Sequence, residues 1–279
     1  MGSRQVGTVA ALFRYPVKSM LGEKMTELMV GSGGVVGDRA WALREIVNGR
    51  IVSAKKLPQT FQFRAVYPPD SSSPAITLPD GRTVAADAPD TSEVLSATLG
   101  RNVSLERAQA DQVPRASFDP QTLFGDMPAE QMLEIIMKYQ EVDVGPDNWA
   151  LPRGTFFDGA PLHILASGTL THLARLAGAS RFDPRRFRPN ILVDTGSEAG
   201  RFIEDEWLNH ALQIGRETEI AVTVPVVRCV MTTHSQEDLP RDLALLRTVA
   251  KQHEALVGAY ANVKTPGRIR IGDPVILAD

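Results

Sequence analysis

Alternation of apolar and polar positions dominates the first hundred residues. Val6 to Phe13 is rich in strand-forming residues, and two later stretches each place a turn dipeptide between apolar-bearing arms. These dipeptides are Asn48-Gly49 and Asp80-Gly81, both strong signals for β-hairpins. Short strands with turns at this spacing predict a barrel or a sandwich, not alternating strand and helix units. We therefore expect β-structure throughout this region.

The alternation ends in residues 115–150. The stretch AEQMLEIIMKYQ has helical spacing, but its surroundings are rich in Pro, Asp and Gly, so we expect a connecting segment with one short helix. A strand, PLHILAS, then leads into the stretch GTLTHLARLAGAS, whose apolar residues share one helical face. Ser167 is expected to cap the start of this helix and Gly178 its end.

The rest of the chain is strand-like with one helix. Strands are expected at PNILVD, LQIG, EIAVTVPVVRCVMTT and GRIRIGDPVIL. Between the last two, the helix-like face of PRDLALLRTVAKQHEALV includes Leu243, Leu246, Ala250 and Val257. No flexible linker separates the halves of the chain. The pattern predicts a mainly β protein with some α structure (α+β), folded as two packed β-rich lobes.

Composition limits the classes of function. A hydrophobic content of 43% with 23% charged residues is ordinary for a globular protein. A formal net charge of -3 predicts no binding surface for nucleic acid or for an anionic membrane. The early apolar stretch is too short for a membrane span and has no cleavage site. A single cysteine excludes an intramolecular disulfide and fits a reducing compartment, so we expect a cytoplasmic protein.

That cysteine, Cys229, follows Arg228 near the end of an apolar run. A free cysteine is often a buried apolar residue, and this interpretation stays open. However, a guanidinium inside an apolar run must find an anion or leave the core, and a nearby cation favours the reactive thiolate. A straight strand would point the two side chains to opposite faces. Pro225 predicts an edge, a bulge or a strand start that could re-aim them.

Three short stretches, YPVKS, VGDRAW and RRFRPN, gather polar groups at strand ends. Each stretch alone is typical of solvated charge. Together with Arg228, and with N–H donors at the helix start after Ser167, they predict a pocket for a small phosphate-bearing ligand. The polar residues of the three stretches are Lys18, Ser19, Asp38, Arg39, Arg185, Arg186, Arg188 and Asn190. The histidines show no metal-binding spacing, and we expect no zinc site.

These motifs, in this order, resemble the MOSC family with its N-terminal β-barrel partner. The resemblance rests on YPVKS, GDRAW, FRPNILVD, EDEW, VVRC and GRIRIGDPVIL, and it runs from about Val6 to Leu277. The family is named after the C-terminal domain of molybdenum cofactor sulfurases and includes the amidoxime-reducing components. The resemblance implies an N-terminal β-barrel domain over residues 1–115, which could also receive the C-terminal strands, and a MOSC β-barrel domain over residues 116–279. The molybdopterin cofactor would lie between them.

The resemblance also assigns site residues. Cys229 matches the cysteine that ligates molybdenum in amidoxime-reducing members, and thiolate is a suitable ligand for this metal. The implied cofactor is the molybdenum cofactor (Mo-molybdopterin), whereas pyridoxal phosphate would belong only to partner sulfurases. The cofactor-anchoring positions match Lys18, Ser19, Arg39, Ser167, Arg188, Asn190, Arg228 and Tyr260.

The implied function is an oxidoreductase that reduces small N-hydroxylated compounds, such as amidoximes. The sequence does not identify the proton donor; Asp38 and Asp194 are candidates, and a structural role for both is the preferred interpretation. The chain lacks the four cysteines of the iron–sulfur domain of some bacterial relatives. Electrons are therefore expected from a separate ferredoxin, flavodoxin or cytochrome-type protein. A second function stays open: a non-catalytic carrier of the cofactor, or of sulfur as a Cys229 persulfide. An interaction module with an inert cysteine remains only if no cofactor binds.

Overall fold

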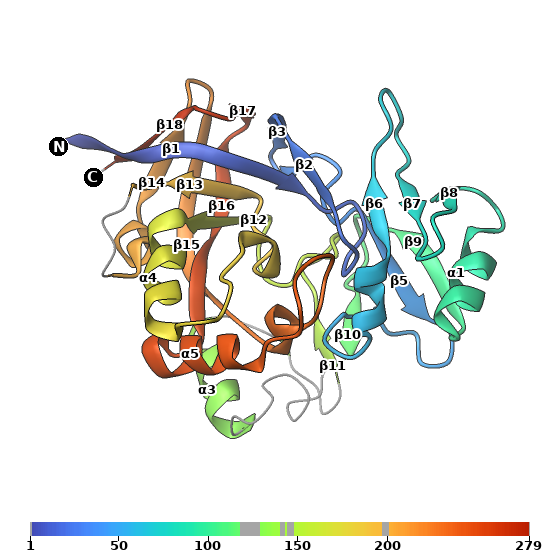
Figure 1. The fold of residues 1–279 in the computed structure, drawn as a ribbon. Coiled ribbons are helices and arrows are strands. Elements are labelled where there is room, and N and C mark those ends of the chain that lie inside the picture. The colour runs from blue at the N-terminus through green and yellow to red at the C-terminus, as the bar shows by residue number, and fades with distance from the viewer. Residues whose placement is uncertain (1, 118–128, 140–142, 144–147, 197–200, 279) are drawn as a thin grey trace.

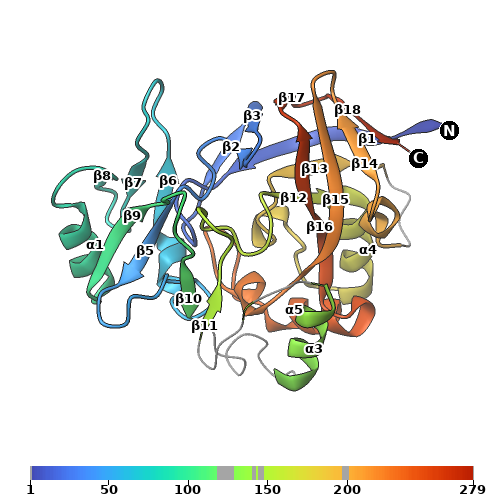
Figure 2. The same cartoon turned by 180° about the vertical axis from the view of Figure 1, so that it is seen from behind.

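The computed structural model describes residues 2–117, 129–139, 143, 148–196 and 201–278. Strands make up 37% and helices 22%, so the predicted α+β class is confirmed. Figures 1 and 2 show two β-rich lobes side by side, a larger one that carries both chain ends and a smaller one at the other side. In the described part of the chain, no helix is long and apolar enough to cross a membrane.

Seven strands of the larger lobe close into a barrel. Their hydrogen-bonded order is β13-β12-β16-β15-β14-β18-β1, and β1 pairs back onto β13. β12 and β13 are parallel, whereas the other neighbouring strands are antiparallel. The barrel interior is a dry core that includes Leu12, Ile164 and Trp207. The strands are β1 (Ser3–Arg14), β12 (Leu162–Ala166), β13 (Ile191–Asp194), β14 (Ala211–Ile214), β15 (Thr218–Val227), β16 (Leu256–Thr265) and β18 (Pro274–Ala278).

Helices cover one side of the barrel (Figure 1). α4 connects β12 to β13, and it packs against α5 through a second core that includes Leu173, Leu245 and Val249. α3 contacts β15. The helical elements of this lobe are α3 (Ala129–Tyr139), α4 (Ser167–Ala177), α5 (Leu243–His253), η2 (Pro184–Arg186), η3 (Ile203–Trp207) and η4 (Val230–Thr233).

The smaller lobe has its own core, which includes Trp41, Phe63 and Leu95. In it β5 pairs with β9, and β6, β7 and β8 form a three-stranded sheet. Its elements are β5 (Trp41–Glu45), η1 (Pro58–Gln62), β6 (Arg64–Val66), β7 (Ala75–Thr77), β8 (Thr83–Ala85), α1 (Thr91–Leu99) and β9 (Val103–Arg107).

Short strands join the two lobes. β2 extends the barrel sheet from β1, and β3 and β4 form a sheet with β17 from near the end of the chain. Leu28, Val30 and Ile269 of that sheet belong to the barrel core. β10 pairs with β11. These strands are β2 (Glu23–Met25), β3 (Glu27–Gly31), β4 (Gly34–Val35), β10 (Arg115–Ser117), β11 (Asn148–Ala150) and β17 (Gly267–Arg270).

Several predicted elements are confirmed. They include the first strand, the hairpin at Asp80-Gly81, the short helix within residues 115–150, and the end of α4 at Gly178, whose φ is 66°. At Asn48-Gly49 the chain does turn, but the second arm contributes only a single bridge between Arg44 and Ile51. The strand partner of β5 is β9 instead.

Other expectations were wrong. The first hundred residues contain a helix, α1, where only β-structure was expected. Ser167 does not cap α4, because its hydroxyl donates to Asp194 and accepts from the backbone N–H of Thr195. Val257 belongs to β16, since Glu254 takes a left-handed conformation that ends α5. GRIRIGDPVIL forms two strands, β17 and β18.

Candidate functional site

A cavity lies where the two lobes meet. The space between the side chains that line it, including the part open to solvent, is about 870 Å³. The lining comes from distant parts of the chain, including Lys55 of the smaller lobe, Trp149 of β11 and Met231 of η4. Of the residues predicted for the site, those that line the cavity are Arg39, Arg186, Arg188, Asn190, Arg228, Cys229 and Tyr260.

A bulge in β15 explains how Arg228 and Cys229 reach the same cavity. The pairing of β15 with β16 shifts register on both sides of Pro225, so among the edge, bulge and strand start that this proline predicted, the pairing fits a bulge. The backbone N–H of Arg228 donates to Ala255 O at 2.7 Å, and Cys229 follows in an extended conformation. Cys229 O then accepts from Thr232 N at 3.1 Å, which starts η4. The thiol is partly exposed in the cavity wall.

Two buried guanidinium groups line the cavity together with the thiol, and each has an N–H donor without an acceptor among the described residues. Arg188 is 6% exposed; its Nη1 donates to Met20 O at 2.7 Å, and its Nη2 has no partner among the described residues. Arg228 is 7% exposed; one N–H donates to Phe187 O, and Nε has no partner in the same set. Burial lowers the pKa of Arg228, and it lowers the pKa of Arg188 to about 10, so Arg188 remains charged at neutral pH. An anion would supply the missing acceptors.

The ring of Tyr15 supports two of the cations. The guanidinium carbon of Arg188 lies 4.1 Å from the ring centroid and that of Arg39 lies 4.9 Å from it. Burial raises the pKa of Tyr15 to about 12, so the phenol is neutral. Arg39 pairs with buried Asp38, which also accepts from Tyr15 N at 2.7 Å. Asp38 is thereby occupied, and it does not belong to the cavity lining.

Asn190 and His163 form a rigid part of the wall. Asn190 Oδ1 accepts from His163 N at 3.1 Å, and Asn190 N donates to His163 O at 2.8 Å. His163 Nδ1 lies 3.3 Å from Arg188 O, and burial holds the pKa of this imidazole well below its usual value. The ring of Tyr260 meets it edge-on, with centroids 6.1 Å apart. His163 is therefore a neutral, buried support of the cavity.

Three predicted anchoring residues lie outside the cavity lining. Buried Lys18 donates from Nζ to Phe156 O at 2.8 Å and to Asp158 Oδ1 at 2.9 Å. Ser19 Oγ accepts from Ala54 N at 3.0 Å. The Ser167 hydroxyl, at the start of α4, donates to Asp194 at the end of β13 and accepts from Thr195 N, as described above. Their assignment to the cofactor stays a prediction.

The sequence pattern did not reveal Lys55, Trp149 and Asp158 as lining residues. Lys55 Nζ lies 3.9 Å from the centroid of the Trp149 ring and 3.7 Å from Asp158 Oδ1. All three come from loops or short strands without a periodic pattern. The FFDG stretch around Asp158 carries the one available signal, a carboxylate beside a turn glycine just before a buried strand.

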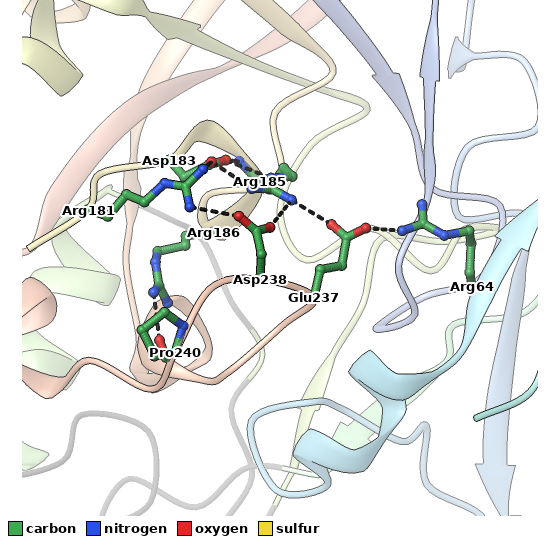
Figure 3. A network of polar contacts seen from close by, with 8 residues as sticks. All are labelled: Arg64, Arg181, Asp183, Arg185, Arg186, Glu237, Asp238 and Pro240. Atoms are coloured by element: carbon green, nitrogen blue, oxygen red, sulfur yellow. Dashed lines mark hydrogen bonds and ion pairs between the residues drawn. The ribbon is translucent and has the colours of Figure 1, made fainter. Parts of the chain in front are cut away.

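The segment after Cys229 is held from η2. Buried Arg186 donates to three carbonyl oxygens of this segment: Thr232 O at 3.2 Å, His234 O at 3.2 Å and Pro240 O at 2.6 Å. Its neighbour Arg185 joins an outer network of ion pairs that extends to the smaller lobe (Figure 3). The network members are Arg181, Asp183, Arg185, Glu237, Asp238 and Arg64.

The donor set fits a phosphate-bearing cofactor that brings its own metal ligands. The described residues contain no group of three or more His, Cys, Asp or Glu side chains that could hold a bare metal ion. One thiol beside unsatisfied guanidinium donors suits a metal complex whose other ligands belong to the cofactor, anchored through its phosphate.

Two family models match the chain. The MOSC domain matches residues 152–276, and the MOSC N-terminal beta barrel domain matches residues 6–115. Mitochondrial amidoxime-reducing component 1 of Mus musculus is 25% identical over 307 residues, which covers 98% of this chain and 83% of that protein. Mitochondrial amidoxime reducing component 2 of Homo sapiens is 25% identical over 305 residues, with 98% and 84% covered. Among solved structures, the YUAD protein from Bacillus subtilis is 12% identical with a TM-score of 0.49, over 99% of this chain and 97% of that one.

Proposed function

The chain belongs to the MOSC family, with a MOSC N-terminal beta barrel domain ahead of the MOSC domain, and from this we propose a molybdenum-cofactor-dependent reductase. Its substrates would be small N-hydroxylated compounds of the amidoxime type. Its electrons would come from a separate ferredoxin, flavodoxin or cytochrome-type protein. The names of the relatives, which are amidoxime-reducing components over most of the chain, support this class of reaction.

One observation carries the proposal: Arg188 and Arg228 present unsatisfied buried donors in the cavity that Cys229 also lines. These guanidinium groups would bind the cofactor phosphate, with Arg39 beside them on the Tyr15 ring. The Cys229 thiolate would ligate molybdenum. Lys18, Ser19 and Ser167 are proposed contacts: the Lys18 ammonium has a third N–H besides its bonds to Phe156 O and Asp158 Oδ1, whereas the two serine hydroxyls would first have to exchange a present partner.

When bound, the cofactor supplies two-electron chemistry that removes oxygen from an N–O bond. The chain contributes the surroundings of that reaction. Phe157, Trp149 and Ile136 give part of the cavity an apolar wall that excludes water from the substrate. The bulge at Pro225 and the hold of Arg186 on the following segment keep the Cys229 sulfur in one place.

The first test is metal and pterin analysis of protein produced in a host that makes molybdopterin, beside Cys229→Ser and Arg188→Ala. We expect near-stoichiometric molybdenum and pterin in the wild type. The Cys229→Ser variant should keep the pterin with altered molybdenum ligation, whereas Arg188→Ala should lose most of both. Absence of pterin from the wild type under these conditions would contradict the proposal and make a Cys229 persulfide the next species to look for by mass spectrometry.

Turnover separates the enzyme from the carrier. Loaded protein is given benzamidoxime and an artificial reductant, and benzamidine formation is followed. Formation that depends on Cys229 supports the reductase. Tight cofactor binding with no turnover, and transfer of the cofactor to an apo-enzyme, would instead favour a cofactor carrier.

A further inference from the structure

Asp158 is the only carboxylate among the residues that line the cavity within the described part of the chain. The charged residues around it are cations, and it follows buried Phe157 in the loop before β12. Neither of the carboxylates suggested by sequence, Asp38 and Asp194, belongs to the lining. Asp158 therefore gives the cavity its one anionic hydrogen-bond acceptor from a side chain.

The two oxygens of Asp158 differ in their surroundings. Oδ1 accepts from Lys18 Nζ at 2.9 Å and lies 3.7 Å from Lys55 Nζ. Oδ2 has no hydrogen bond or ion pair with any described residue, and the side chain is 34% exposed. Lys18 and Lys55 together hold the pKa of this carboxyl far below its usual value, so it is ionised. A charged acceptor is thus available to a molecule in the cavity.

The carboxylate is held in place from several sides. A Cβ on the next residue, Gly159, would lie 2.7 Å from Tyr260 Cε2, so the loop packs directly on that ring. Lys18 fixes Oδ1 from a buried position, and Lys55 is held over the Trp149 ring. The acceptor therefore stands at a fixed place beside a flat aromatic surface.

This inference rests on the proposed function: we propose that Asp158 is a specificity-determining residue of the reductase. It selects substrates that carry an N–H donor next to the N–O group, as N-hydroxylated amidines and guanidines do. Asp158 Oδ2 accepts that N–H, while Trp149 and Phe157 contact the apolar substituent. Oximes and N-oxides without a neighbouring N–H leave Oδ2 without its partner and bind more weakly. Both ammonium groups near Asp158 are already engaged with its other oxygen, so they do not favour an acidic substrate instead.

The test compares two ligands of nearly equal shape by calorimetric titration of cofactor-loaded protein without reductant. Benzamidoxime carries an amino group where acetophenone oxime carries a methyl group, and both carry the same N–OH group. We expect benzamidoxime to bind about 10- to 100-fold more tightly to the wild type, the range for a hydrogen bond to a charged group. Asp158→Asn should reduce this preference to about threefold or less, because its amide can place a donor against the ligand N–H.

Asp80→Asn is the matched control, since it removes a carboxylate from an exposed hairpin turn and should leave the preference unchanged. Equal affinities of the two ligands for the wild type would overturn the inference without any variant, which matters if Asp158→Asn fails to fold. A preference that survives in a folded Asp158→Asn would overturn it as well. Because no turnover is needed, this result is separate from the test of the reductase. The proposed function fails if loaded wild type does not reduce benzamidoxime.

Discussion

Arg188 and Arg228 are retained in the folded chain at a cost in stability. Removing a charged group from water costs several kcal/mol unless an opposite charge is close. Carbonyl oxygens and the rings of Tyr15 and Phe187 compensate only part of this cost. Within the described residues, no carboxylate pairs with either guanidinium. A site built for an anion explains the arrangement, because the bound anion stabilises both groups.

This argument predicts opposite effects on stability and on binding for Arg228→Met. The variant replaces the charge with an apolar chain of similar length, so cofactor-free protein should unfold at the wild-type temperature or a few degrees above it. Pterin content should fall at least about tenfold, as expected for losing a charged hydrogen bond to phosphate. Thermal unfolding followed by circular dichroism, with pterin fluorescence, measures both. The exposed Arg82→Met serves as control, and a less stable variant with full pterin would contradict the assignment.

Lys18 predicts a pH dependence of stability. Burial lowers its pKa to about 8, despite the opposing effect of Asp158. Between about pH 8 and pH 10.5 the unfolded chain holds a proton that the folded chain has released, so unfolding takes up protons and stability rises with pH. The stability of the wild type relative to Lys18→Met should therefore increase by about 1 kcal/mol per pH unit in that window. Urea titrations at several pH values measure this, with exposed Lys264→Met as control. A constant difference would show that Lys18 is not titrating there.

At the scale of elements, local signals predicted several strands and turns, but the strong Asn48-Gly49 signal did not predict the partner of β5, which is β9. Strand-forming residues predicted β1, and an Asp-Gly turn predicted the β7–β8 hairpin; Pro225 predicted an edge, a bulge or a strand start, of which the register of β15 fits the bulge. β16 was missed because no Gly or Pro separates it from α5, and the break comes from left-handed Glu254 and Ala255.

The residues of the site also divide into those that local sequence signals predicted and those that they did not. The sequence motifs identified the arginines and Cys229 of the site, whereas Asp158, Lys55 and Trp149 come together only through tertiary contacts. The pattern of each stretch alone contains no information on which of its residues will face the others across the lobes.

Gly258 lets β16 pack closely against β12 beside the cavity. Its φ is +78°, and a Cβ there would lie 2.3 Å from His163 Nε2 and 3.0 Å from Ile164 O. Gly258→Ala should therefore lower the free energy of unfolding by about 3 kcal/mol or more, through both backbone strain and a clash inside the barrel. Gly81→Ala is the matched control, because its φ is +87° with open space around it, so only the strain of about 1 kcal/mol should appear. Urea unfolding of both variants measures the difference, and equal losses would mean that the clash relaxes.

At the scale of the whole molecule, the chain crosses between the lobes repeatedly. β1 closes the barrel and leads directly to Lys18, whose ammonium returns to Phe156 O. Arg188 reaches Met20 O from the barrel side, and Arg64 joins the outer network through Glu237 (Figure 3). We still propose domains over residues 1–115 and 116–279, but these contacts make their folding interdependent. The cavity, which both lobes line, then forms only when both are folded.

Interdependent lobes predict a single unfolding transition. Trp41 lies in the core of the smaller lobe and Trp207 in the barrel core, so variants that keep only one of the three tryptophans report on each lobe separately. The urea midpoints of these variants should coincide after each is corrected for the change in stability that its own substitutions cause, which circular dichroism measures. In a companion test, residues 116–279 produced alone should show no cooperative transition, because the barrel lacks β1, and residues 1–115 supplied with them should restore it. A cooperative transition in the isolated fragment would mean that β1 is dispensable for the barrel, and separate midpoints for the two tryptophans would mean that the cavity joins two independently folding domains.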